Sequence, residues 1–287
     1  MRILKLLSRR GSSPGRNGRP DVSVVVPVNA QGDLDNVQRL LEDLSRYRGP
    51  HTVETILVVN NFPAGKMPAG IRALRRSADV VLTIPDARRL GEAIGFSARI
   101  PGVRAASSPY VVLLDADCRV PNPTQLLNWY VAQFRGGAQA AYTHVAFHDC
   151  ERAATIYAYL FVHHLVRWVK RRILGIPTTR GSNYAVRRDT LLDLYDRGLL
   201  ADEMNVGPTF KRLKGRVVYG SGRRLRVLTS GRMFRPGWYL LGPYLLYRLR
   251  YNVRVLPVRA GVARRTGRED DPIRRYRDNR PVSTEDV

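Results

Sequence analysis

The feature that most constrains the fold is a repeated alternation of short apolar runs with helical segments in the first half of the chain. The apolar runs are rich in branched residues and have the length of strands buried on both faces: 21–28, 53–61, 79–85 and 110–117. The segments between them have helical spacing or composition: 35–47, 67–78 and 91–106. This order predicts an α/β fold with a mostly parallel central sheet and helices on both of its faces.

Polar residues stand at or just past the ends of these four strands. Because ligands bind beyond the carboxyl ends of parallel strands, the polar residues are expected to share one rim of the sheet. They are Asn29, Asn60, Asn61, Asp86, Asp115 and Asp117. The sequence therefore predicts a ligand site collected from separate strands.

Two of these residues, Asp115 and Asp117, flank a single alanine. Side chains alternate along a strand, so both carboxylates are expected to point to the same side. Such a pair suits a hard divalent cation, Mg²⁺ or Mn²⁺, that keeps positions open for water or phosphate oxygens. The alternative is that the aspartates cap the strand or pair with arginines.

The second half of the chain is less regular. We expect a helix at 121–134, one strand at 138–148, a long helix at 153–174, a loop, strand and helix within 180–195, a helix or two turns at 201–215, and two strands within 216–230. Pro101-Gly102 is expected to bend or split the helix at 91–106, and Gly207-Pro208 is expected to break the segment at 201–215.

Charge is the unusual property of the composition. The chain has 48 Lys and Arg against 24 Asp and Glu, a formal net charge of +24. This excess favours a polyanionic neighbour, although an arginine-rich genome would produce it too. Nucleic acid is the least favoured partner because no motif of a nucleic-acid reader is present. Segment 237–258 mixes Trp, Tyr and Leu with arginines, which is typical of a helix on an anionic membrane surface or of a helix packed on the domain.

Cysteine usage and hydropathy predict the compartment. Two cysteines form no disulfide framework and no zinc pattern, as expected in a reducing cytosol. The start of the chain lacks the long apolar run of a secretory signal, and no run is long enough to span a bilayer. We expect a cytoplasmic protein, with peripheral attachment to the inner face of the membrane as the open alternative.

Six segments, in order, resemble those of the family 2 glycosyltransferases of the GT-A fold. They are VSVVVPV, ILVVNN, GFSARIPGVRAASSPYVVLLDADCRVP, RGSNYAVRRD, ADEMNVG and VLTSGR. The resemblance runs from Val22 to about Arg232. The chain departs from the family pattern at Asn60, where many members have aspartate, and at Ile100, where asparagine is usual. These departures concern the donor base more than the fold.

The resemblance implies transfer of a sugar from a nucleotide-diphosphate sugar to an acceptor. Asp115 and Asp117 would then bind Mg²⁺ or Mn²⁺ on the donor diphosphate, where a cation stabilises the departing nucleoside diphosphate. The nucleoside would lie against Pro27, Val28, Asn29, Asn60 and Asp86. Arg232 would lie near the donor phosphates, and the turn of Gly181, Ser182 and Asn183 would face the acceptor.

An inverting transfer also needs a general base for the proton of the acceptor. The adjacent acids Asp202 and Glu203 are the candidates, and Glu203 ranks first because both alignments with the family pattern include it. The alternative is that the two acids form the N-terminal cap of a helix.

The resemblance also divides the chain. It implies a GT-A domain at 21–235, with a donor half at 21–120 and an acceptor half at 121–235. A basic tail at 1–20, an amphipathic helical extension at 236–261 and a disordered tail at 262–287 would flank it. The acceptor class stays open between lipid-linked, glycan and small molecules. Two other functions also stay open: a sugar nucleotidyltransferase, and an inactive GT-A domain that binds anionic lipid or RNA.

Overall fold

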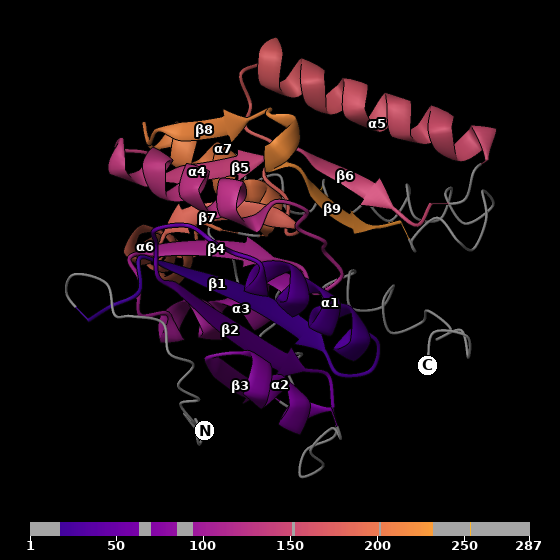
Figure 1. Ribbon diagram of the computed structural model, residues 1–287. Helices are drawn as coiled ribbons and strands as arrows, with labels where there is room; N and C mark the ends of the chain where they lie inside the picture. The colour runs from indigo at the N-terminus through magenta and orange to yellow at the C-terminus, as the bar shows by residue number, and fades with distance from the viewer. Residues whose placement is uncertain are drawn as a thin grey trace.

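The computed structural model has three layers, a central sheet between two layers of helices (Figure 1). It describes residues 18–62, 70–84, 94–150, 153–200, 202–231 and 253. Two candidate site residues, Asp86 and Arg232, lie outside the described residues, as do residues 1–17 of the expected basic tail, nearly all of 236–261, and 262–287.

The central sheet has seven strands in the order β3-β2-β1-β4-β7-β5-β8. Their bounds are β1 Val22–Asn29, β2 Val53–Asn60, β3 Val80–Ile84, β4 Tyr110–Leu114, β5 Ala140–Thr143, β7 Asn183–Arg187 and β8 Val217–Gly220. Strand β7 is antiparallel to both of its neighbours, and every other pair in this sheet is parallel. The predicted mostly parallel α/β sheet is confirmed.

Both faces of the sheet are buried, because alternate strand residues enter two separate cores. On β1, Val24 and Val26 belong to one core and Val25 to the other. The first core also contains apolar residues of α1 Leu34–Ser45, α2 Ile71–Ser77 and α4 Pro123–Arg135. The second contains residues of α3 Ile94–Ala105, α6 Arg188–Asp196 and α7 Glu203–Arg212. Helices therefore cover both faces, as predicted.

A second, two-stranded sheet pairs β6 Val145–His148 in parallel with β9 Val227–Ser230, which follows the short 3₁₀ helix η2 Arg223–Leu225. The prediction of a single strand at 138–148 is wrong, because the chain changes sheets at His144. There the His144 amide donates to the Gly220 carbonyl (3.3 Å), and the Val227 amide donates to the His144 carbonyl (3.1 Å). Pairing with two different partners decided this division, and the residue pattern does not encode it.

Helix α5 Ala154–Arg172 runs along the outer edge of the molecule (Figure 1). It exposes large apolar side chains: Tyr157, Phe161, Val162, Leu165, Val166 and Trp168. Even so, none of the described helices combines the length and the apolar character needed to cross a membrane.

The expected break at Gly207-Pro208 is wrong, and the helix at Pro101-Gly102 is not split. Helix α3 continues through Pro101, and α7 continues through Pro208. In both helices a neighbouring glycine lets the helix lie close to the rest of the fold: a Cβ on Gly102 would lie 2.5 Å from Val25 Cγ1. A proline costs about 3 kcal/mol in a helix interior, and close packing offsets this cost here.

Substitution of Gly102 by alanine is expected to destabilise the protein. The new methyl group would lie 2.5 Å from Val25 Cγ1 and 2.7 Å from Val58 Cγ2, two buried valines of the sheet. Overpacking of this kind costs about 1–3 kcal/mol, of which the better helix propensity of alanine recovers less than about 1 kcal/mol. Urea unfolding of Gly102→Ala checks the loss, with Gly32→Ala as the control because no atom lies within 4 Å of its new Cβ. Equal stability of the two variants would contradict the proposed close contact.

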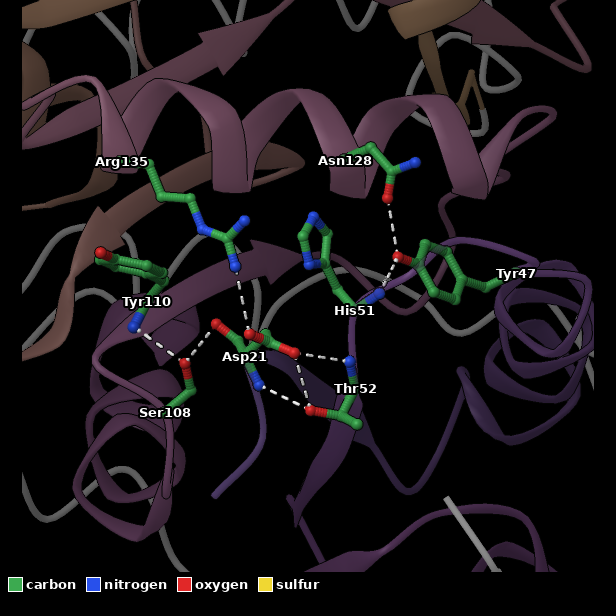
Figure 2. A network of polar contacts seen from close by, with 8 residues as sticks. All are labelled: Asp21, Tyr47, His51, Thr52, Ser108, Tyr110, Asn128 and Arg135. Atoms are coloured by element: carbon green, nitrogen blue, oxygen red, sulfur yellow. Dashed lines mark hydrogen bonds and ion pairs between the residues drawn. The ribbon is translucent and has the colours of Figure 1, made fainter. Parts of the chain in front are cut away.

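Polar contacts fasten the amino-terminal edge of the sheet (Figure 2). The Asp21 carboxylate accepts hydrogen bonds from the amide (2.9 Å) and the hydroxyl (3.0 Å) of Thr52, and Arg135 approaches it at 3.5 Å. Ser108 donates to the Asp21 carbonyl (2.8 Å) and accepts from the Tyr110 amide (3.0 Å). Burial raises the pKa of Asp21, but the hydrogen bonds from Thr52 together with the charges of His51 and Arg135 outweigh it, so the pKa lies below its usual value. These contacts join β1, β2 and β4 at the edge opposite the predicted ligand rim.

Candidate active site

The candidate site lies where the strand order of the sheet changes direction. From β1 the chain builds β2 and then β3 on one side, and it returns to place β4 on the other side of β1. Asn29 ends β1 and is in register with Asn60, which ends β2, while Asp115 directly follows β4. Ligands of open α/β sheets bind at such a point, beyond the carboxyl ends of the strands.

Asp115 and Asp117 lie in a turn and not on the strand itself. Strand β4 ends at Leu114, and the Cys118 amide donates to the Asp115 carbonyl (3.1 Å). The expectation that strand pleating puts the two carboxylates on one side therefore does not apply. Asp115 pairs with Arg99, whereas Asp117 accepts a hydrogen bond from the Thr229 hydroxyl (3.2 Å) on β9.

Arg99 of α3 joins the two halves of the site. One guanidinium nitrogen pairs with Asp115 and also donates to the Gly181 carbonyl (3.1 Å), while the other terminal nitrogen pairs with Glu203. The Arg99 side chain is only 1% exposed. A single buried cation thus holds a carboxylate at the end of β4 and a carboxylate at the start of α7.

Arg99 is not among the site residues predicted from the sequence. A signal was present, because Phe96, Ile100 and Val103 form the buried stripe of α3 and Arg99 falls within it. An arginine in an apolar stripe is expected to have a carboxylate partner inside the fold.

The charges of this group shift the pKa values of its members. Burial lowers the pKa of Arg99, but the carboxylates of Asp115 and Glu203 more than compensate, so the pKa lies above its usual value. Burial is the largest effect on Glu203 and raises its pKa. Arg99 lowers this pKa and the nearby Asp202 and Asp115 raise it, so the pKa lies above that of an ordinary glutamate. A carboxylate with a raised pKa is a better proton acceptor, as a general base requires.

The structure separates the roles of Asp202 and Glu203. Asp202 is the N-cap of α7: its carboxylate accepts a hydrogen bond from the Asn205 amide (2.9 Å), and the residue is 1% exposed. Glu203 pairs with Arg99 in the site, and its side chain is 16% exposed. The helix-cap alternative therefore describes Asp202, and Glu203 is the better candidate for chemistry.

Gly181, Ser182 and Asn183 are not equivalent. A Cβ on Gly181 would lie 2.8 Å from a terminal nitrogen of Arg99 and 3.3 Å from Glu203 Oε1, so the close approach of Arg99 requires a residue without a side chain here. The Asn183 amide instead accepts from the Tyr130 hydroxyl (2.6 Å) and donates to the Thr143 hydroxyl (2.5 Å), and Asn183 is 1% exposed. The placement of Asn183 on the acceptor side is thus not supported, because its side chain is used inside the core.

At the end of the first two strands, Asn29 and Asn61 are linked. The Asn29 side-chain oxygen accepts from the Gln31 amide (3.0 Å) and from the Asn61 side chain (3.0 Å). Asn61 has a positive φ of 62°, a conformation that asparagine tolerates better than most residues. The pair forms a polar surface at the rim where the sequence placed a nucleoside.

The other donor-side candidates are less exposed. Val28 is completely buried, and Asn60 is 4% exposed with its side chain 3.4 Å from the Val58 carbonyl. Val28 therefore offers no exposed atom to a ligand, whereas Pro27 is half-buried.

The carboxylates fit a metal ion only in part. Within the described portion of the chain, no group of three or more His, Cys, Asp or Glu residues is placed to hold a metal ion. Asp115 and Asp117 supply two carboxylates, and Mg²⁺ in phosphate-handling sites is commonly held by one or two carboxylates together with substrate phosphates. The residues therefore fit a cation that binds together with a diphosphate, and they do not fit a metal site made by the protein alone.

Comparison with solved structures finds glycosyltransferases. Glucosyl-3-phosphoglycerate synthase from Mycobacterium tuberculosis, in complex with Mn²⁺, UDP and glucosyl-3-phosphoglycerate, is 19% identical with a TM-score of 0.52, over 89% of this chain and 87% of that chain. Its complex with Mn²⁺, UDP-glucose and glycerol 3-phosphate is 20% identical with a TM-score of 0.51, over 88% and 86%. The mannosyltransferase PcManGT from Pyrobaculum calidifontis, in complex with GDP-mannose and Mn²⁺, is 19% identical with a TM-score of 0.49, over 75% of this chain and only 58% of that chain.

No family model matches this chain, and no curated protein matches it in sequence. The matches to the synthase extend over most of both chains and establish a shared fold. The GT-A glycosyltransferase fold predicted from the six sequence segments is confirmed.

Proposed function

We propose that this protein is a metal-dependent, inverting glycosyltransferase of family 2, which moves a sugar from a nucleotide-diphosphate sugar to a hydroxyl group. One observation carries the proposal: Arg99 joins Asp115, at the rim where donors bind in such sheets, to Glu203 on α7. A donor-side carboxylate and a candidate base thus belong to a single site. The solved relatives of the same fold support the reaction class, since their complexes contain UDP-glucose and Mn²⁺.

The donor is expected to lie along the rim formed by β1, β2 and β4. Asn29 and Asn61 would contact the nucleoside, together with Pro27 and Asp86. Asp115 and Asp117 would hold Mn²⁺ or Mg²⁺ against the diphosphate, with Arg232 near the phosphates. When bound, the cation would offset the negative charge that develops on the departing nucleoside diphosphate.

Glu203 would accept the proton of the acceptor hydroxyl while that oxygen attacks the anomeric carbon. A new bond forms between the acceptor oxygen and the sugar, and the bond between the sugar and the diphosphate breaks, with inversion at the anomeric carbon. Arg99 acts as a positioning residue, because it fixes the Glu203 carboxylate relative to Asp115. In this scheme residues 21–120 form the donor half and residues 121–235 the acceptor half.

A thermal-shift experiment with UDP-, GDP- and dTDP-sugars tests the donor and the metal together. Mn²⁺ alone is expected to have little effect, because the described residues offer no self-sufficient metal site. Mn²⁺ with the correct donor at about 100 times its Kd should stabilise the protein by about 2.7 kcal/mol, or on the order of 5 °C. Asp117→Ala should abolish this shift.

Asp189→Ala is the matched control for Asp117→Ala. It also removes one carboxylate, but Asp189 lies on α6 with a side chain that is 78% exposed. This variant should keep the full response to donor and Mn²⁺. If the folded protein responds to no nucleotide sugar, or if Asp117→Ala responds like Asp189→Ala, the proposed function is wrong.

A further inference from the structure

Four arginine and two histidine side chains gather between α5, the segment before β7 and the start of β9. We name them the cationic cluster: His164, Arg167 and Arg171 of α5, Arg180 before β7, His144 between β5 and β6, and Arg226 before β9. The rings of His144 and His164 stack with centroids 5.4 Å apart. Residues far apart in the sequence thus bring positive charge to one place.

Arg167 and Arg171 are held by neutral partners. Arg167 is 9% exposed and donates to the carbonyl (2.7 Å) and hydroxyl (3.5 Å) of Thr178, and Arg171 donates to the same hydroxyl (3.3 Å). Aromatic rings support two of the guanidinium groups: Arg171 lies 4.3 Å from the centroid of Tyr219, and Arg180 lies 5.2 Å from that of Phe147. Thr178 and Tyr219 orient Arg167 and Arg171 but do not neutralise their charge.

Three arginines of the cluster have no carboxylate partner within the part of the chain that the structure describes. Among the described residues, Arg167, Arg171 and Arg226 form no ion pair with Asp or Glu. This contrasts with the other buried arginine, Arg99, which has two carboxylate partners. A buried charge is costly unless an opposite charge accompanies it.

The pKa values reflect this mutual repulsion. Burial, followed by the charges of Arg180 and Arg171, lowers the pKa of Arg167 to about 9. Burial, followed by His164 and the neighbouring arginines, lowers the pKa of His144 to about 4. An anion placed among these groups would relieve both the burial cost and the repulsion.

The cationic cluster is connected to the candidate active site through four consecutive residues. Thr178 binds Arg167, the Thr179 hydroxyl donates to the Glu203 carbonyl (2.8 Å), and the Gly181 carbonyl accepts from Arg99 (3.1 Å). Three residues of fully extended chain span at most about 11 Å. The Cα atoms of Thr178 and Gly181, the residues that contact Arg167 and Arg99, are therefore at most about 11 Å apart, a distance on the scale of a small molecule.

We propose that the cationic cluster binds a phosphate group of the acceptor, so that the acceptor hydroxyl is presented to Glu203. Guanidinium groups form paired hydrogen bonds with phosphate oxygens, and a phosphate can accept from several arginines at once. The assignment of the phosphate to the acceptor rests on the glycosyl transfer proposed above. The binding of phosphate by the cluster does not.

The phosphate has two sources, a soluble phosphorylated molecule or the headgroup of a lipid. A lipid headgroup is tested separately because α5 exposes apolar side chains beside the cluster. They are Tyr157, Phe161 and Leu165, which are spaced four residues apart, and Trp168. Apolar side chains of this kind insert into the headgroup region of a bilayer.

The experiment titrates the full chain with inorganic phosphate by calorimetry, without donor and again with UDP and Mn²⁺ present. The double variant Arg171→Ala/Arg226→Ala should bind phosphate at least about tenfold more weakly, since each hydrogen bond to a charged group contributes about 1.5–3 kcal/mol. Arg171 is half-buried and Arg226 exposed, so the variant should fold, which thermal unfolding verifies. Arg39→Ala, an exposed arginine of α1, is the control and should change the affinity less than about twofold.

A parallel arm measures sedimentation with phosphatidylcholine vesicles, with and without phosphatidic acid. Cluster-dependent binding to the acidic vesicles alone assigns the phosphate to a lipid, and cluster-dependent binding of inorganic phosphate alone assigns it to a soluble acceptor. Three results would overturn the proposed cluster site. They are no binding of either phosphate or acidic vesicles, a phosphate affinity that is unchanged in the double variant, and displacement of phosphate by UDP and Mn²⁺. Binding of UDP and Mn²⁺ in the same samples tests the proposed function separately. If the protein binds phosphate but no nucleotide, the proposed glycosyl transfer is contradicted and the phosphate site is retained.

Discussion

Glu203→Gln is expected to lower sugar transfer by about 10²- to 10⁴-fold, the range that a positioned general base contributes. Glutamine keeps the shape of the side chain and can still contact Arg99, but it cannot accept the proton of the acceptor hydroxyl. Binding of the nucleotide sugar should remain, because Glu203 lies on α7 and not on the donor rim. Transfer rates and donor affinity, measured side by side with the wild type, check the result.

The pH profile of the same reaction gives an independent check. The pKa of Glu203 is raised, first by burial, so transfer by the wild type should decline at a higher pH than an exposed glutamate, with its ordinary pKa of about 4.3, would cause. Asp202→Asn tests the other candidate and keeps a good helix cap. Loss of transfer in Asp202→Asn but not in Glu203→Gln would show that Glu203 was assigned wrongly.

Arg99→Met is expected to produce the largest loss of stability. Removal of one partner from a buried ion pair costs about 3–5 kcal/mol, and the lower end applies here because Asp115 is 35% exposed. Without Arg99, Asp115 and Glu203 are two like charges in one site. The pKa of Glu203 should rise further because Arg99 no longer lowers it, and the stability lost at neutral pH should partly return as the pH falls and a proton binds.

Arg104→Met is the matched control on the same helix. Arg104 also pairs with a carboxylate, Asp196, but both side chains are 53% exposed, so the cost should be below about 1 kcal/mol. Urea unfolding at pH 7 and pH 5 compares the stabilities of the two variants. The free energy of unfolding of Arg99→Lys should lie between those of Arg99→Met and Arg104→Met, because lysine keeps the positive charge but not the several donors of a guanidinium group. If Arg99→Met unfolds like Arg104→Met at pH 7, the bridge described here is not an important interaction.

The first half of the fold could be predicted because its signals are local. The branched run Val22–Asn29 and the helical spacing in Leu34–Ser45 are each contained in a few residues. The continuity of α3 through Pro101 could not be predicted in this way, because it depends on the contact of Gly102 with Val25 and Val58. The division of 138–148 into two strands likewise depended on partners more than 70 residues away in the chain.

The sequence by itself determined the polar rim. Asp115 follows its strand directly, and parallel strands end together, so its place on the rim follows from the order of elements. Tertiary structure alone decided what surrounds that rim. Arg99 and Glu203 are 104 residues apart, yet their contact distinguishes Glu203 from the neighbouring Asp202, which caps a helix. The same folding placed Asn183 in the core and assembled the cationic cluster from four separate segments. The physical reason is that strand and helix signals act between near neighbours, whereas the pairing of buried charges depends on which distant segments the fold brings into contact.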